Sequence, residues 1–173
     1  MAERVPDIRP MILSAWRTNN RVTLELVERL PAPLWDAAVP GVPRHTIRMI
    51  AAHLHNARRS WIKTLGHEFG VAVPARVDQR RVSRRQLAAA LRRSSRGMEA
   101  LLALGFAAGG VLPASKAYVW RNLPLDVAHV LAYFVAHEAH HRGQIVMAAR
   151  QLGQRPTAVI NGLWQWQSRK SRR

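Results

Sequence analysis

Apolar residues recur at helical spacing in four long stretches of the chain. An amphipathic helix repeats its apolar positions every three or four residues, because 3.6 residues make one turn. This pattern predicts helices over about residues 8–30, 46–65, 83–105 and 126–152. No stretch shows the period-two alternation of a strand. The sequence therefore predicts an all-α fold, in which four helices form an up-and-down or crossover four-helix bundle.

Residues that cap helices stand at three of the predicted helix starts. Thr46 and Asp126 each precede an apolar stripe, and their side-chain oxygens can accept a bond from a free backbone N–H. Ser83 is followed three residues later by Gln86, which is the spacing of a capping box. The segment 105–124 is rich in glycine and proline. It predicts a long connection before the last long helix.

The length and composition suit a single domain. The chain has 173 residues, of which 48% are hydrophobic, so it can bury a substantial core. We expect one domain over residues 1–166 and a flexible basic tail over residues 167–173. The segment 31–45, with four prolines and a glycine, predicts a loop between the first two helices.

The chain contains no cysteine, which excludes disulfides, thiolate metal sites and cysteine nucleophiles. Any bound metal must therefore take nitrogen or oxygen ligands. No window is apolar enough for a membrane span, and the first ten residues lack the apolar stretch of a secretory signal. We expect a cytoplasmic protein with no membrane partner.

The charge is strongly basic, with 27 lysines and arginines against 10 acidic residues. Such a balance favours polyanions, because binding releases condensed counterions. Only three of the basic residues are lysine, and such arginine dominance is typical of GC-rich genomes. No zinc-finger spacing, helix-turn-helix junction or aromatic stacking platform accompanies the arginines. We therefore expect nucleic acid to bind only non-specifically.

Two histidines of the last predicted helix have the spacing of metal ligands. His137 and His141 lie four residues apart, so they project from one face about one turn apart and can chelate one ion. The alternative interpretations are a polar helix surface and histidines that hydrogen-bond to their neighbours in a core. A pair on or beside the inward face favours a metal, because an unpaired buried ring costs free energy.

The same residues spell H-E-x-x-H, the signature of zinc proteases in which the glutamate is the general base. Those enzymes take a third ligand downstream, yet no histidine, aspartate or glutamate follows His141. The match is therefore coincidental. Glu138 remains the nearest carboxylate and a conceivable base, although it is turned about 100° from His137 on the helix.

A third protein ligand must come from upstream, where His53 and His55 lie in the second predicted helix. Each is turned about 100° to one side of Leu54, the centre of the apolar stripe, so periodicity gives both equal claims. Arg48, Arg58 and Arg59 flank His55 and would repel a cation, which favours His53.

The blocks HLHNARRSW and HEAHHRGQIVMAARQLG, with GLWQW near the end, resemble the DinB/YfiT-like superfamily of metal-dependent enzymes. The resemblance implies a four-helix bundle, often a homodimer, in which three histidines bind zinc, nickel or a similar divalent metal ion. The family's ligands correspond to His53, His137 and His141. His140 corresponds to a doubled histidine that lies beside the site. Some members are S-transferases in which the metal activates a low-molecular-weight thiol.

Three imidazoles leave coordination positions free for water or substrate, as in reactive rather than structural sites. The sequence thus favours a metal-dependent hydrolase or a thiol-dependent S-transferase acting on a small molecule. A nucleic-acid-associated protein and a non-catalytic, metal-stabilised scaffold are the alternatives. No catalytic residue is assigned.

Several neighbours of the histidines have expected roles of their own. We expect Asn56 to hydrogen-bond a ligand ring, since metal-bound histidines usually have such partners. We expect Arg142 to brace a neighbouring helix. Four tryptophans are expected to pack in the core: Trp61, Trp120, Trp164 and Trp166.

Overall fold

The protein is mainly helical in the computed structural model, which describes residues 7–155 and 157–166. This confirms the predicted fold class at that level; the tail expected over residues 167–173 lies outside the described residues. The helices are α1 (Arg9–Arg29), α2 (Ala32–Trp35), α3 (Ile47–Gly66), α4 (Arg84–Ala107), α5 (Val127–Gln151) and α6 (Thr157–Leu163), with a short 3₁₀ helix η1 (His67–Phe69). Two strands, β1 (Ala38–Val39) and β2 (Val42–Thr46), form an antiparallel hairpin.

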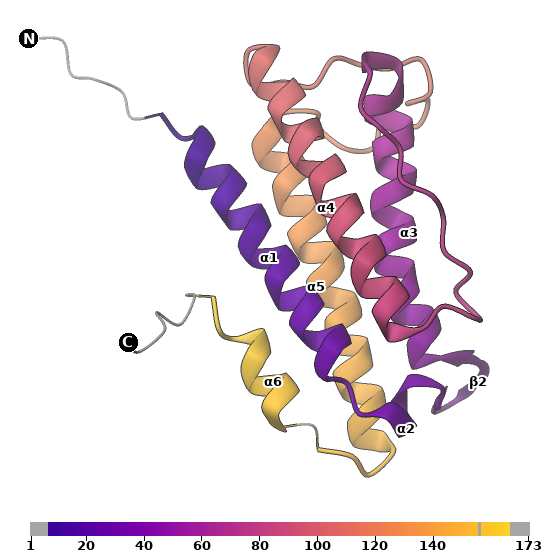
Figure 1. Cartoon of the computed structure of the whole chain (residues 1–173). Coiled ribbons are helices and arrows are strands. Elements are labelled where there is room, and N and C mark those ends of the chain that lie inside the picture. Colours follow the sequence, from indigo (N-terminus) through magenta and orange to yellow (C-terminus); the bar gives the residue numbers. More distant parts are fainter. Residues whose placement is uncertain (1–6, 156, 167–173) are drawn as a thin grey trace, which may run out of the picture.

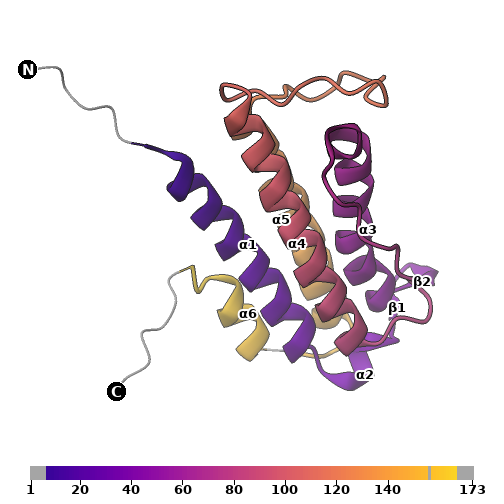
Figure 2. The ribbon, with the colours of Figure 1, turned by 45° about the horizontal axis from the view of Figure 1, so that its top comes forward.

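The long helices α1, α3, α4 and α5 lie side by side, and α6 packs against α1 (Figure 1). Both α1 and α3 contact α4 and α5. The connection from α4 to α5 crosses the end of the helices, as Figure 2 shows from a second direction. No helix among the described residues is long and apolar enough to cross a membrane.

The helix starts follow the predicted capping chemistry. Thr46 Oγ1 accepts a hydrogen bond from the Met49 N–H, and Asp126 accepts one from the His129 N–H at 3.0 Å. Ser83 and Gln86 form both bonds of a capping box. These local bonds satisfy backbone groups that have no partner within the helix, so they fix where α3, α4 and α5 begin.

The predicted loop before α3 is partly wrong, because it contains the hairpin β1–β2 and the short helix α2. Pro40 and Gly41 form the turn between the paired residues Val39 and Val42, and Gly41 has a φ of +77°. A proline followed by a glycine with positive φ suits a tight turn. The sequence did not predict these strands because Pro40 and Pro43 lie in or between them, and proline is rare within sheets.

A buried polar layer divides the core into two apolar clusters. One cluster includes Leu26, Leu54 and Ile145, and the other includes Trp16, Ile62 and Phe134. Between these levels, each long helix contributes polar side chains with relative exposures of 0–5%: Asn19, Thr23, Arg58, Ser94, Ser95, Glu138 and Arg142. Buried polar groups cost free energy unless they are hydrogen-bonded, so this layer must be fully partnered.

The prediction that four tryptophans pack in the core is wrong for three of them. Trp120, Trp164 and Trp166 are 57%, 79% and 44% exposed. Trp61 does pack, with its ring 5.3 Å from that of Tyr133 and 6.1 Å from that of Phe134. Helical periodicity says nothing about the burial of the three exposed tryptophans, because one lies in the α4–α5 connection and two lie after α6.

Candidate metal centre

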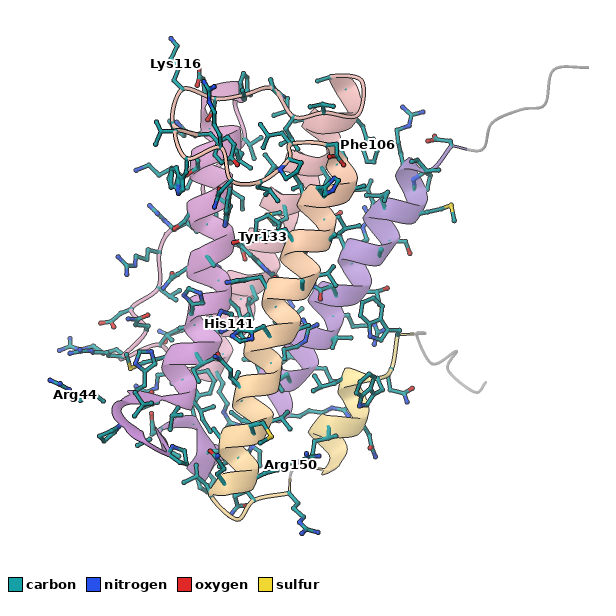
Figure 3. All side chains as sticks on the ribbon, turned by 180° about the vertical axis from the view of Figure 1, so that it is seen from behind. Arg44, Phe106, Lys116, Tyr133, His141 and Arg150 are labelled. Atoms are coloured by element: carbon teal, nitrogen blue, oxygen red, sulfur yellow. The ribbon has the colours of Figure 1, made fainter. Side chains whose placement is uncertain are left out.

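Three histidines from two helices converge between α3 and α5. His53 Nε2 lies 3.4 Å from His137 Nε2, which in turn lies 3.2 Å from His141 Nε2. One ligand atom of each ring lies within 4.8 Å of those of the other two. Figure 3 shows His141 between the ribbons of α3 and α5, with Tyr133 two turns earlier on α5. The structure thus brings together the three residues predicted as ligands.

Two of the three separations between the ligand nitrogens have the length expected around one metal ion, and the third is within 4.8 Å. Zinc–nitrogen bonds of about 2.0–2.1 Å at tetrahedral angles place neighbouring nitrogens about 3.3–3.4 Å apart. The distances of 3.4 and 3.2 Å agree with this edge length. The donor set, three imidazoles without thiolate or carboxylate, suits zinc, copper, iron and nickel among the divalent ions.

Gln144 fixes the protonation of His141. Its Oε1 lies 2.7 Å from His141 Nδ1, and a carbonyl oxygen can only accept, so Nδ1 carries the proton. In the neutral ring the lone pair is then on Nε2, which faces His137. The Gln144 amide nitrogen lies 3.0 Å from His140 Nε2. The sequence analysis missed Gln144, although its position three residues after His141 places it within reach on the helix.

All three rings favour the neutral form that a metal requires. Burial, followed by repulsion from His141 and His53, lowers the pKa of His137 to about 4. Burial also lowers the pKa of His53 and His141, in the latter case against the opposing effect of the Gln144 hydrogen bond. The site therefore need not lose protons to bind a metal at neutral pH.

His55, the alternative upstream ligand, faces the core instead. Its Nε2 lies 2.9 Å from the carbonyl oxygen of Ala75, and its Nδ1 lies 3.1 Å from Ser94 Oγ. The side chain is fully buried, and burial lowers its pKa. Both ring nitrogens are thus committed to bonds between α3, α4 and the segment between them.

Asn56 does not bond a histidine ring, contrary to expectation. Its amide donates to the Val77 carbonyl and accepts from the Val77 N–H, each at 3.1 Å. Together with the bond between His55 and Ala75, these contacts hold the segment between η1 and α4 against α3. Residues 75–77 are therefore fixed beside the three histidines.

Glu138 is part of the polar layer and is not available as a base. Arg58 donates to both of its oxygens, at 2.6 and 2.8 Å, and Asn19 and Thr23 donate to Oε2. Burial alone would raise the pKa of Glu138, but the charge and hydrogen bonds of Arg58 outweigh burial and lower it. The carboxylate stays ionised with its acceptor positions occupied.

Arg142 has the predicted bracing role. It donates to Asn19 Oδ1 at 2.9 Å and to Thr23 Oγ1 at 2.7 Å, so it joins α5 to α1. Asn19 and Thr23 each contact both Arg142 and Glu138. This network lies behind His137 and His141 and holds α5 in place.

The other histidines lie outside the cluster of three. His140 is exposed and its ring centre is 5.1 Å from that of His141, as expected for a neighbour of the site. His129 pairs with Asp126 at the start of α5, and His67 is exposed after α3. His45, from β2, lines a pocket beside the cluster.

Two pockets open on either side of the histidines and share His53 and Gln79. One, of about 510 Å³, is mostly apolar; its lining includes Val39, Val42, Met49, Ile50, His141 and Met147. The other, of about 420 Å³, is polar; its lining includes Asn56, Arg59, Trp61, Arg76, Tyr133 and His137. Their volumes suit parts of a small molecule. The hairpin that the sequence analysis missed supplies a wall of the apolar pocket.

A sequence model of the DinB family matches residues 9–171. The chain belongs to the DinB family. This match covers all three histidines and every long helix, and DinB membership supports metal binding at the cluster. No curated protein and no solved structure matches the chain significantly.

Proposed function

We propose that this DinB protein is a metal-dependent enzyme that acts on a small molecule, with His53, His137 and His141 as the protein ligands of a zinc or nickel ion. The observation that carries this proposal is the convergence of three neutral imidazoles at 3.2 and 3.4 Å between two pockets. A structural zinc site needs four protein ligands. The described residues place no fourth histidine or carboxylate in the cluster.

Such an ion supplies Lewis acidity, which polarises a carbonyl or lowers the pKa of a water or thiol ligand. The chain's own residues orient the ligands and the substrate. Gln144 holds the His141 tautomer, and the apolar pocket offers room for an uncharged part of a substrate on one side of the site. Of the described acidic residues, none lines either pocket, and Glu138 is fully paired.

The lack of an accessible carboxylate among the described residues favours transfer of a thiol over hydrolysis. Even with a metal-bound water, hydrolysis generally uses a base to move protons during the reaction, whereas a thiol ionises far more readily. The chain has no cysteine, so the thiol must be a separate low-molecular-weight molecule. A thiol-dependent S-transferase is therefore the preferred reaction class, and a metal-dependent hydrolase is the second candidate.

The remaining expectations belong to the same proposal. We propose that α1, α3, α4 and α5 form a four-helix bundle in a single domain, that two copies assemble as a homodimer, and that the enzyme works in the cytoplasm. Nucleic acid would bind the +17 charge only non-specifically.

The proposal is tested with purified protein loaded with zinc or nickel. One set of assays follows thioether formation from low-molecular-weight thiols and 1-chloro-2,4-dinitrobenzene, and the other follows hydrolysis of p-nitrophenyl esters. Thioether formation should disappear with a chelator, return with added metal, and be absent in His137→Ala but present in the exposed control His67→Ala. Ester hydrolysis alone with the same metal dependence would favour the hydrolase, and activity indifferent to chelator would refute both.

A further inference from the structure

The polar pocket beside His137 carries positive charge without a counterion. Arg59, on α3, and Arg76, on the segment before α4, both line it. Within the described residues, neither arginine forms a hydrogen bond or ion pair, and no acidic side chain lines the pocket. Most other acidic residues of the chain are already paired, as Glu138 is with Arg58 and Glu28 with Arg92.

Arg59 is held in an environment that an exposed surface arginine does not have. Its Nε is buried and has no hydrogen-bond partner in the described structure. A buried N–H without a partner costs about 1–3 kcal/mol, because it has lost its water. This Nε has almost no accessible surface, so a ligand in the pocket would meet the other Arg59 atoms that line it.

Arg76 is placed in the pocket by bonds on both sides of it. The Ala75 carbonyl accepts from His55, and the Val77 backbone forms two bonds with Asn56. These contacts fix the backbone of residue 76 against α3, and the exposed Arg76 side chain extends from it along the pocket. The sequence suggested His55 as a possible ligand and Asn56 as a partner of a ligand ring. In the structure these two residues instead hold the segment that carries Arg76.

Aromatic side chains line the polar pocket beside the two arginines. Trp61 and Tyr133 form an aromatic wall with ring centres 5.3 Å apart, and Tyr133 stacks on His137 at an interplanar angle of 17°. Guanidinium groups bind carboxylate and phosphate through paired N–H donors. A divalent ion on the histidines would repel the two arginines. An anion bound between them would be attracted to all three positive charges, and this attraction would offset the repulsion.

We infer that the pocket lined by Arg59 and Arg76 binds the carboxylate or phosphate group of a small-molecule substrate, whose remaining part reaches the histidines. This inference rests on the proposed function, because it names the substrate class of the same site. The anionic group can belong to the thiol or to its reaction partner. In either case the substrate is a small organic anion, and the apolar pocket receives an uncharged part.

Matched ligand pairs test the inference without an activity assay. The thiols 3-mercaptopropionate and 3-mercaptopropionamide have nearly the same size and shape but differ in charge, as do benzoate and benzamide in a pair without a thiol. Binding is measured by titration at 0.15 M salt, where exposed charges are screened beyond about 8 Å. Zinc-loaded and metal-free proteins are compared for the wild type, Arg59→Met and Arg76→Met. Arg80→Met is the control, because Arg80 lies on the same segment, is exposed and lines neither pocket.

The anionic member of at least one pair should bind more tightly to the wild type. Arg59→Met and Arg76→Met should each weaken it about fivefold to tenfold, whereas Arg80→Met should leave it unchanged. Preference in the thiol pair alone assigns the anionic group to the thiol, and preference in the benzoate pair assigns it to the other substrate. No preference in the wild type, or equal loss in all three variants, overturns the inference. Failure to retain zinc in the wild type would instead refute the proposed function.

Discussion

Glu138→Gln is the sharpest test of the polar layer behind the histidines. The substitution keeps the size of the side chain but replaces the charge and one oxygen acceptor with an amide N–H₂. In the wild type the carboxylate accepts from Arg58 at 2.6 and 2.8 Å, from Asn19 at 2.9 Å and from Thr23 at 2.8 Å. The variant leaves two buried arginines without a counterion and turns N–H groups toward donors.

The expected cost follows from the burial of these groups. The Arg58 and Glu138 side chains are each 1% exposed, and Arg142 is 6% exposed, so water cannot replace the lost bonds. Removing one partner of such a buried network costs about 3–5 kcal/mol. That is a large part of the about 5–15 kcal/mol by which a domain of this kind is stable.

The assay is equilibrium urea unfolding followed by circular dichroism, with a chelator present so that metal binding does not contribute. Glu99→Gln is the matched control, because Glu99 pairs with Arg17, whose side chain is 62% exposed. It should lose less than about 1 kcal/mol. A Glu138→Gln protein as stable as Glu99→Gln would refute the structural role of Glu138 and restore it as a candidate base.

Two further predictions concern the histidines. Gln144→Leu should weaken zinc affinity about 10- to 100-fold in a competition titration, because His141 loses the acceptor that fixes its tautomer. The control Gln154→Leu, at an exposed residue that lines neither pocket, should not; equal affinities would contradict this role. The pKa of His137 is lowered from its ordinary value of 6.5 to about 4 in the folded protein. Below pH 6.5 the unfolded chain therefore binds a proton that the folded protein does not, so the metal-free protein should lose stability as the pH falls from about 6.5 to 4. The loss should be about 1 kcal/mol, because solvent screens the charge of a half-buried ring. Urea unfolding across this range should show a shallower loss in His137→Ala, and an unchanged slope would contradict the shift.

Local signals in the sequence predicted the long helices well. The predicted range 83–105 compares with an α4 of Arg84–Ala107, and the capping residues Ser83 and Asp126 act as expected. These features depend on residues within one or two turns of each other. The same holds for His137 and His141, whose separation on one helix face follows from four residues of helix.

The polar layer could have been found from the spacing in α5. Phe134, Glu138, Arg142 and Ile145 follow one another at steps of four, four and three, and all four are buried. The buried stripe therefore passes through Glu138 and Arg142, and the histidines stand one position to its side. From the sequence alone, Arg142 is expected to brace a neighbouring helix and Glu138 is expected only as a conceivable base. Neither expectation places the two side chains in one buried layer, because charged residues are rarely fully buried.

Contacts between residues far apart in the sequence determine which upstream histidine joins the cluster and where the pockets lie. The position of His55 depends on Ser94 in α4 and on Ala75, which lie 39 and 20 residues away. The charge argument favoured His53, the residue in the cluster, but its premise was wrong. Arg58 points into the core, and Arg59 lines the pocket beside His53 and His137. The pockets are lined by residues of the hairpin and of the segment before α4. The positions of these two segments cannot be predicted from the local sequence pattern.

The metal content of the purified protein tests the central claim most directly. Protein loaded with zinc and dialysed should hold about one equivalent by elemental analysis, and His53→Ala, His137→Ala and His141→Ala should each lose most of it. His45→Ala is the control, because His45 lines the adjacent pocket but lies outside the cluster; it should retain the metal. Retention of a full equivalent by any of the three cluster variants, or its loss from His45→Ala alone, would contradict the site described for this DinB protein.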